Sequence, residues 1–268
     1  MTPRRERDPV NAADLAEDRG VALAMFDLAP GTVDRLDRFV DLLLTWQRHT
    51  NFVAAASVAS LWTRHVADSL QLLDLVPARG PRGPVIVDVG SGGGFPGVVL
   101  ACALAGSPGA EVHLVESIGK KATFLREAVL ETGAPGIVHA ARLEQVMPGF
   151  LKKPVDYVTA RAVARLPDLL ELIAPLLKSG ATAVLPKGQG LDEELTESTG
   201  RWHMEADTVP SRTNAAARIL VVRTLTLRSV ATHSSGAGKG TGSTRNPAAR
   251  HVKVRHPRAK GLKVKEGK

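Results

Sequence analysis

The segment VIVDVGSGGGFPGVVLA, residues 85–101, constrains the fold more than any other part of the chain. Its apolar and β-branched start predicts a fully buried strand over 85–89. A run of glycines follows, and Pro96 then stands where a helix should begin, since proline suits a first helical position. We therefore expect a glycine turn at the carboxyl end of a parallel strand, which is where open α/β sheets bind ligands.

The chain after this segment alternates short β-branched runs with helical stretches. Strands are predicted over 85–89, 111–116, 136–140, 155–160 and 181–186, and helices near 96–105, 119–132, 167–177 and 190–199. Strands separated by helices indicate a parallel sheet with right-handed crossovers. Two further strands, in WHMEADTV and ARILVVRTLTL, are expected as an antiparallel pair at the edge of the sheet. The prediction is therefore an α/β fold with seven strands, most of them parallel.

Four regions are expected along the chain. Residues 1–29 are predicted to be partly mobile, and apolar residues at helical spacing predict a helical cap over 30–80. Residues 81–232 form the ligand-binding core, and 233–268 are predicted to be a basic, disordered tail. The tail holds ten Lys or Arg and one acid, so it accounts for the net charge of +8 and the rest is nearly neutral. Such a tail suits salt-sensitive phosphate binding or a solubilising extension.

Composition excludes several classes of protein. The single cysteine, Cys102, rules out an internal disulfide and a cysteine-rich zinc site. No group of His, Cys, Asp and Glu has metal-ligand spacing, so we expect no metal. No signal peptide or membrane span is recognisable, so a soluble cytoplasmic protein without membrane contact is expected.

Two glycine patterns overlap in the turn, and they predict different ligands. The pattern G-x-G-x-x-G fits Gly92, Gly94 and Gly97 and suggests a dinucleotide. The pattern D-x-G-x-G-x-G fits Asp88, Gly90, Gly92 and Gly94. A carboxylate such as Asp88 repels a pyrophosphate but attracts a sulfonium or an amino-acid ammonium. We therefore favour S-adenosylmethionine; the alternative is that the glycines only form a tight turn and Asp88 caps the helix.

An acid at the end of the second predicted strand supports a nucleoside ligand. Glu116 follows the run VHLV. A carboxylate in this position accepts both hydroxyls of a ribose, as it does in dinucleotide sites. Glu116 therefore indicates a ribose, but it does not distinguish the two cofactors.

Several segments together resemble one family. They are RHVADSL (64–70), DVGSGGGFPG (88–97), ESIGKKATFL (116–125), TARAVARL (159–166) and LPKGQ (185–189). From about Leu43 to Leu227 the chain is similar to the bacterial 16S rRNA guanine-N7 methyltransferases, the glucose-inhibited division protein B (RsmG) family. The resemblance implies a Rossmann-like class I methyltransferase core with a helical N-terminal cap. It also implies cofactor contacts from Gly90, Phe95, Leu143, Glu144 and Arg161.

The activity implied by the resemblance is methylation of a guanine N7, at position 527 in the 530 loop of 16S rRNA. N7 already carries an exposed lone pair, so the reaction requires no general base. The partner would be 16S rRNA or the small ribosomal subunit, bound by a monomer. We expect RNA contacts from the helical cap and from basic residues at the strand ends: Arg64, His65, Lys120, Lys121, Arg165 and Lys187.

Two other functions remain open at this stage. One is an NAD-dependent oxidoreductase, because the turn also fits a dinucleotide. The other is a non-catalytic RNA-binding or ribosome-assembly factor that keeps the fold.

Overall fold

The predicted strands form one seven-stranded sheet in a computed structural model that describes residues 12–228. The strand order is β3-β2-β1-β4-β5-β7-β6, with the first five strands parallel and β7 antiparallel to both neighbours. The bounds are β1 Val85–Val89, β2 Glu111–Val115, β3 Gly136–His139, β4 Tyr157–Ala160, β5 Thr182–Lys187, β6 Trp202–Pro210 and β7 Arg218–Leu227. The predicted sheet and its antiparallel edge are confirmed. The basic tail lies outside the described residues.

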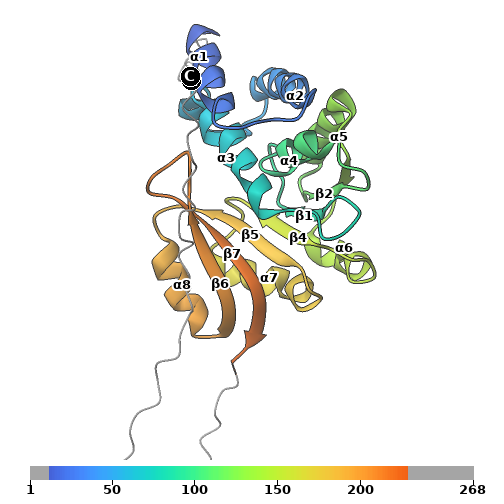
Figure 1. The fold of residues 1–268 in the computed structure, drawn as a ribbon, viewed down its shortest axis with the longest axis vertical. Helices are drawn as coiled ribbons and strands as arrows, with labels where there is room; N and C mark the ends of the chain where they lie inside the picture. The colour runs from blue at the N-terminus through green and yellow to red at the C-terminus, as the bar shows by residue number, and fades with distance from the viewer. Residues whose placement is uncertain (1–11, 229–268) are drawn as a thin grey trace, which may run out of the picture.

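Helices cover both faces of the sheet (Figure 1). Side chains alternate between the faces along a strand, so Ile86 of β1 joins one core and Val87 joins the other. On the first face lie α4 (Gly97–Leu104) and α5 (Gly119–Thr132). On the second lie α6 (Leu143–Phe150), α7 (Leu166–Lys178) and α8 (Leu191–Thr199). The result is a three-layer α/β architecture.

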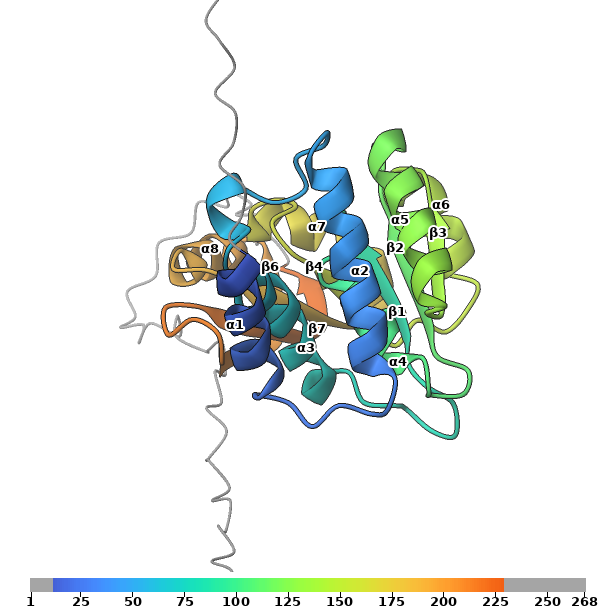
Figure 2. The same cartoon turned by 90° about the horizontal axis from the view of Figure 1, so that it is seen from above.

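The N-terminal helices pack onto the layer of α4 and α5. They are α1 (Ala12–Leu23), α2 (Thr32–Gln47) and a helical stretch made of η2 (Trp62–Ala67), α3 (Asp68–Leu70) and η3 (Gln71–Leu75), with a short turn η1 (Ala55–Ser57) before it. Leu36, Phe39 and Leu43 of α2 are fully buried in the same core as α4 and α5. Seen from above, α2 runs across this face of the molecule (Figure 2). The cap therefore shares its core with the sheet.

One helix that the sequence analysis does not predict is α6, which has eight residues. Pro148 and Gly149 lie within it, and both residues normally argue against a helix. An apolar face formed by Leu143, Met147 and Phe150 packs into the second core. Burial of this face outweighs the poor local propensity, which is why periodicity alone missed the helix.

Candidate functional site

The glycine turn between β1 and α4 depends on backbone conformations that only glycine adopts easily. Gly90, Gly92 and Gly94 have φ angles of +67°, +53° and +89°, in the left-handed region where a Cβ is strained. At Gly97 the constraint is space, because an added Cβ would lie 2.3 Å from Leu114 Cδ2 and 2.5 Å from Asp88 Oδ2. The turn thus brings bare backbone to the carboxyl edge of the sheet.

Asp88 lies beneath this turn. Its side chain is fully buried between β1 and the start of α4, and the hydroxyl of Thr159 donates to Oδ1 at 2.7 Å. Burial raises the pKa of Asp88 to about 6, and the hydroxyls of Thr159 and Ser91 offset only part of that effect. The carboxylate faces Gly97 at the start of α4. Its predicted contact with a cationic ligand remains a prediction.

Glu116 joins the turn to the next helix. Its carboxylate accepts a hydrogen bond from Gly92 N at 3.0 Å and another from Ile118 N at 2.7 Å. The side chain of Ile118 is about half exposed beside Glu116. Leu143 and Glu144, also predicted to contact the cofactor, lie at the start of α6, the first buried and the second exposed. These residues surround the carboxyl ends of β1, β2 and β3.

Arg161, directly after β4, connects the glycine turn to the helical cap. Its guanidinium lies 5.3 Å from the centre of the Phe95 ring, within the range of a cation–π contact. It donates to Asp68 Oδ2 at 3.3 Å and to the backbone oxygen of Arg64 at 3.2 Å. Burial lowers the pKa of Arg161, and Asp68 opposes that shift. The side chain therefore reaches from the turn to the helix that follows Leu61.

The contacts of His65 determine its tautomer. Nδ1 lies 2.7 Å from Nη2 of Arg161, and a guanidinium can only donate, so Nδ1 must accept. The proton is then on Nε2, which donates to Ser57 Oγ at 3.1 Å. Burial, with Arg161 and Arg64 nearby, lowers the pKa of His65 to about 3. His65 is therefore neutral, and it orients Arg161 by accepting a hydrogen bond from the guanidinium.

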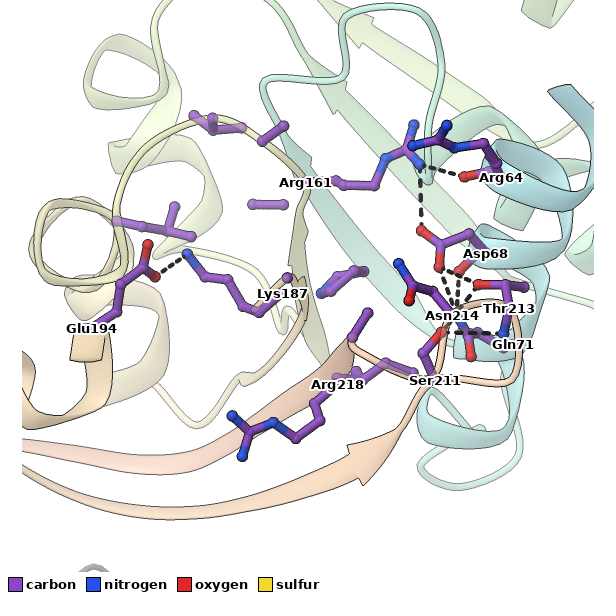
Figure 3. A pocket seen from close by; sticks show the side chains of 18 of the residues that line it. Arg64, Asp68, Gln71, Arg161, Lys187, Glu194, Ser211, Thr213, Asn214 and Arg218 are labelled. Atoms are coloured by element: carbon purple, nitrogen blue, oxygen red, sulfur yellow. Dashed lines mark hydrogen bonds and ion pairs between the residues drawn. The ribbon is translucent and has the colours of Figure 1, made fainter. Parts of the chain in front are cut away.

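A cavity of about 770 Å³ opens at the carboxyl ends of β4 and β5 (Figure 3). Its charged lining comes from five parts of the chain: Arg64, Asp68, Arg161, Lys187, Glu194 and Arg218. The loop between β6 and β7 adds Ser211, Thr213 and Asn214. Ala162 and Val163 also line it, and Val163 Cγ2 would be 2.6 Å from a Cβ at Gly90. The cavity and the glycine turn are thus separated by one loop.

Asp68 is the centre of a hydrogen-bond network in the wall of the cavity that also contains Arg161. Its Oδ1 accepts from Gln71 Nε2 at 2.8 Å and from Thr213 Oγ1 at 2.9 Å, while Oδ2 accepts from Arg161. Gln71 also binds the loop, through Arg212 N at 2.9 Å. The loop between β6 and β7 is therefore held against the helical cap by buried or half-buried polar groups.

The predicted RNA-binding residues separate into two groups. Arg64 and Lys187 line the cavity, and His65 lies behind Arg161. Arg165 is exposed and pairs with Glu197 on α8. Lys120 and Lys121 lie in the first turn of α5, where Lys120 Nζ is 3.4 Å from the backbone oxygen of His49. Only part of the predicted set is thus brought together at the cavity.

Sequence reasoning missed Asp68, Glu194, Asn214 and Arg218 at the cavity. Asp68 lies in RHVADSL, a segment already singled out, so its position beside Arg64 was an available signal. Glu194 lies on α8, Asn214 in the β6–β7 loop and Arg218 at the start of β7, so their positions depend on tertiary packing that no local pattern reveals. Within residues 12–228, no cluster of three metal-ligating side chains occurs, and none of the helices there is long and apolar enough to cross a membrane.

Comparison with known proteins shows what this architecture is similar to. Residues 32–220 match the GidB family, described as rRNA small subunit methyltransferase G. A protein of that name from a Bradyrhizobium strain is 52% identical over 208 residues, covering 78% of this chain and 91% of the relative. The protein of the same name from Hyphomonas neptunium is 41% identical over 212 residues, covering 79% and 97%.

Solved structures agree on the fold. An O-methyltransferase from Bacillus cereus, solved with SAH, superposes with a TM-score of 0.50 at 15% identity, covering 79% of this chain and 99% of the other. A putative O-methyltransferase from Klebsiella pneumoniae also gives 0.50 at 15% identity, covering 78% and 96%. The predicted Rossmann-like class I methyltransferase fold is confirmed.

Proposed function

The chain belongs to the GidB family of rRNA small subunit methyltransferase G, and we propose that it transfers a methyl group from S-adenosylmethionine to N7 of a guanine in 16S rRNA. The observation that carries the proposal is the arrangement of two sites on one sheet edge. A glycine turn with Glu116 beside it adjoins a polar cavity of about 770 Å³, and Val163 of the intervening loop contacts both.

The residues around the turn fit the cofactor. Gly90, Gly92 and Gly94 leave the backbone open to close approach. Glu116 directly follows β2, where we expect its carboxylate to accept the hydroxyls of a ribose, and the exposed Ile118 would offer an apolar surface for an adenine. When bound, S-adenosylmethionine supplies a methyl group on a positively charged sulfur.

The chain's own contribution is to position the acceptor base. Attack by N7 is an in-line displacement, so orientation of the two reactants contributes several kcal/mol without any proton transfer. A target base lying in the cavity would be bounded by Arg161 on one side and by Lys187 and Glu194 on the other (Figure 3). Methylation leaves the guanine positively charged, and the negative carboxylates of Asp68 and Glu194 would stabilise that charge.

The experiment is base-resolved mapping of N7-methylguanine in ribosomal RNA from cells with and without this protein. We expect one guanine of 16S rRNA, in the 530 loop, to lose its methyl group when the protein is absent. An unchanged methylation pattern, with RNA binding retained, would favour the non-catalytic assembly factor instead.

A binding experiment separates the cofactors. Isothermal titration with S-adenosylhomocysteine and with NAD(H) should give heat only with the first. Binding of NAD(H) alone would overturn the proposal in favour of an oxidoreductase.

We also propose that the protein acts in the cytoplasm and is a monomer. Sedimentation of the purified chain would test its oligomeric state.

A further inference from the structure

The ion pair of Lys187 and Glu194 occupies one wall of the cavity, opposite Arg161 and Asp68 (Figure 3). Lys187 Nζ lies 2.7 Å from Glu194 Oε2, and the side chains are only 13% and 21% exposed. Loss of hydration offsets much of the attraction between two such buried charges, so the pair contributes little to stability. Its two ends place a donor and an acceptor side by side in the cavity.

The two carboxylates that line the cavity, Asp68 and Glu194, differ in how many hydrogen bonds their oxygens already accept. Asp68 accepts three side-chain hydrogen bonds, two at Oδ1 and one at Oδ2. In Glu194, Oε2 accepts from Lys187 Nζ and from Leu166 N at 3.1 Å. Among residues 12–228, no hydrogen bond reaches Oε1 of Glu194. Of the two carboxylates, Glu194 therefore has the larger acceptor capacity left for a ligand, because one of its oxygens accepts no hydrogen bond from the described residues.

A guanine matches that pair in polarity. Its N1–H is a donor, and the neighbouring O6 is an acceptor, so N1–H suits a carboxylate oxygen and O6 suits an ammonium. Adenine reverses both, because N1 accepts and the 6-amino group donates. With adenine in the cavity, the carboxylate would face N1, which is also an acceptor, and the ammonium would face the 6-amino group, which is also a donor. Neither contact could form a hydrogen bond.

We propose that Glu194 and Lys187 select the target base, with Glu194 Oε1 accepting from N1–H and Lys187 Nζ donating to O6. This inference rests on the proposed function, because it assumes that the base entering the cavity is the one methylated. It gives Lys187 a contact with the base, where the sequence suggested only a contact with RNA. Base contacts specify a sequence, whereas phosphate contacts position the nucleic acid.

The test uses small subunits reconstituted from 16S rRNA that carries one replaced base at the mapped target position. Inosine keeps N1–H and O6 but lacks the 2-amino group. 2,6-Diaminopurine keeps the 2-amino group but reverses positions 1 and 6. For the full-length wild-type protein we expect kcat/KM for inosine to be within a few-fold of guanine, and that for diaminopurine to be lower by at least about tenfold.

The informative variant is Glu194→Gln, because a glutamine amide can turn and donate to N1 of diaminopurine. We expect the ratio of kcat/KM for diaminopurine to that for guanine to rise by about tenfold. Lys187→Met should lower kcat/KM for guanine and inosine together, since both rely on O6. The matched control is Glu193→Gln, an exposed neighbour on the same helix, which should leave every ratio unchanged.

Ratios between substrates are independent of how much of a variant is folded, so loss of the bond to Leu166 does not obscure the result. A Glu194→Gln ratio equal to that of the wild type would overturn the inference, as would a wild type that rejects inosine. If the wild type methylates no guanine at all, the proposed function itself fails. The two failures are therefore distinguishable.

Discussion

The glycine turn and the polar cavity are the two halves of the site at the carboxyl edge of the sheet, and they are built differently. The glycine turn comes from one continuous segment, 85–97, and Glu116, which bonds Gly92, lies only 24 positions after that glycine. The cavity is assembled from distant parts of the chain: Arg161 meets Asp68 across 93 positions, and Thr213 meets Asp68 across 145. The first half thus depends on local backbone conformation, whereas the second depends on long-range polar contacts.

Substitutions in the turn and at the cavity should therefore destabilise the protein for different physical reasons. A change in the turn should act through crowding. A change around the cavity should act through polar groups that lose their partners.

The largest effect is expected for Arg161→Met. The variant removes the cation between Asp68 and His65, leaving a half-buried carboxylate without one of its partners. Loss of one member of a buried pair costs about 3 kcal/mol in the free energy of unfolding, which urea denaturation measures. Arg165→Met is the control, because its pair with Glu197 is exposed and should cost less than about 1 kcal/mol. Equal losses would show that Arg161 is not the connection between turn and cap.

A smaller loss is expected for Gly97→Ala, which tests the turn by crowding. The new Cβ would be 2.3 Å from Leu114 Cδ2 and 2.5 Å from Asp88 Oδ2, so side chains or backbone must shift. Overpacking of this kind costs about 1–3 kcal/mol in the free energy of unfolding. Gly149→Ala, at an exposed helical position with nothing within 4 Å, should be neutral or stabilising. Similar denaturation midpoints for both variants would contradict the crowding argument.

This difference also explains what the sequence could predict. The turn was readable because glycine and proline act on their own backbone, and the strands because β-branched runs mark buried positions. Glu194 and Asn214 were not readable, since their places depend on how α8 and the β6–β7 loop pack. The surroundings of Asp88 were also not readable: its carboxylate is fully buried and faces Gly97 at the start of α4, and its contact with a ligand remains a prediction.

Acidification should affect the two halves with opposite signs. Asp88 has a pKa of about 6 in the fold against 3.8 in the reference state, so its contribution to stability is greatest below about pH 4 and is lost as pH rises through about 6. His65 has a pKa of about 3 against 6.5. Its contribution is complete above about pH 6.5 and is lost as pH falls toward 3.

Two variants separate these contributions. Chemical denaturation between about pH 4 and 7 should show that Asp88→Asn loses more stability on acidification than the wild type, because the compensating gain is gone. His65→Gln should lose less, since no imidazole is forced to remain neutral. Parallel pH profiles for all three proteins would show that neither group is coupled to folding as the structure indicates.

The smallest effect concerns how far the RNA-binding surface extends from the cavity toward the turn. Arg64 lines the cavity, whereas Lys120 lies on α5 beside the turn. If both contact phosphates, Arg64→Met and Lys120→Met should each weaken binding to 16S rRNA and reduce the salt-dependence slope by about 0.7 to 0.9. Lys152→Met, exposed beyond the end of α6, is the matched control and should change neither. A slope altered by Arg64→Met alone would confine the interface to the cavity half, because cations beside the turn would then remain in solvent when RNA is bound.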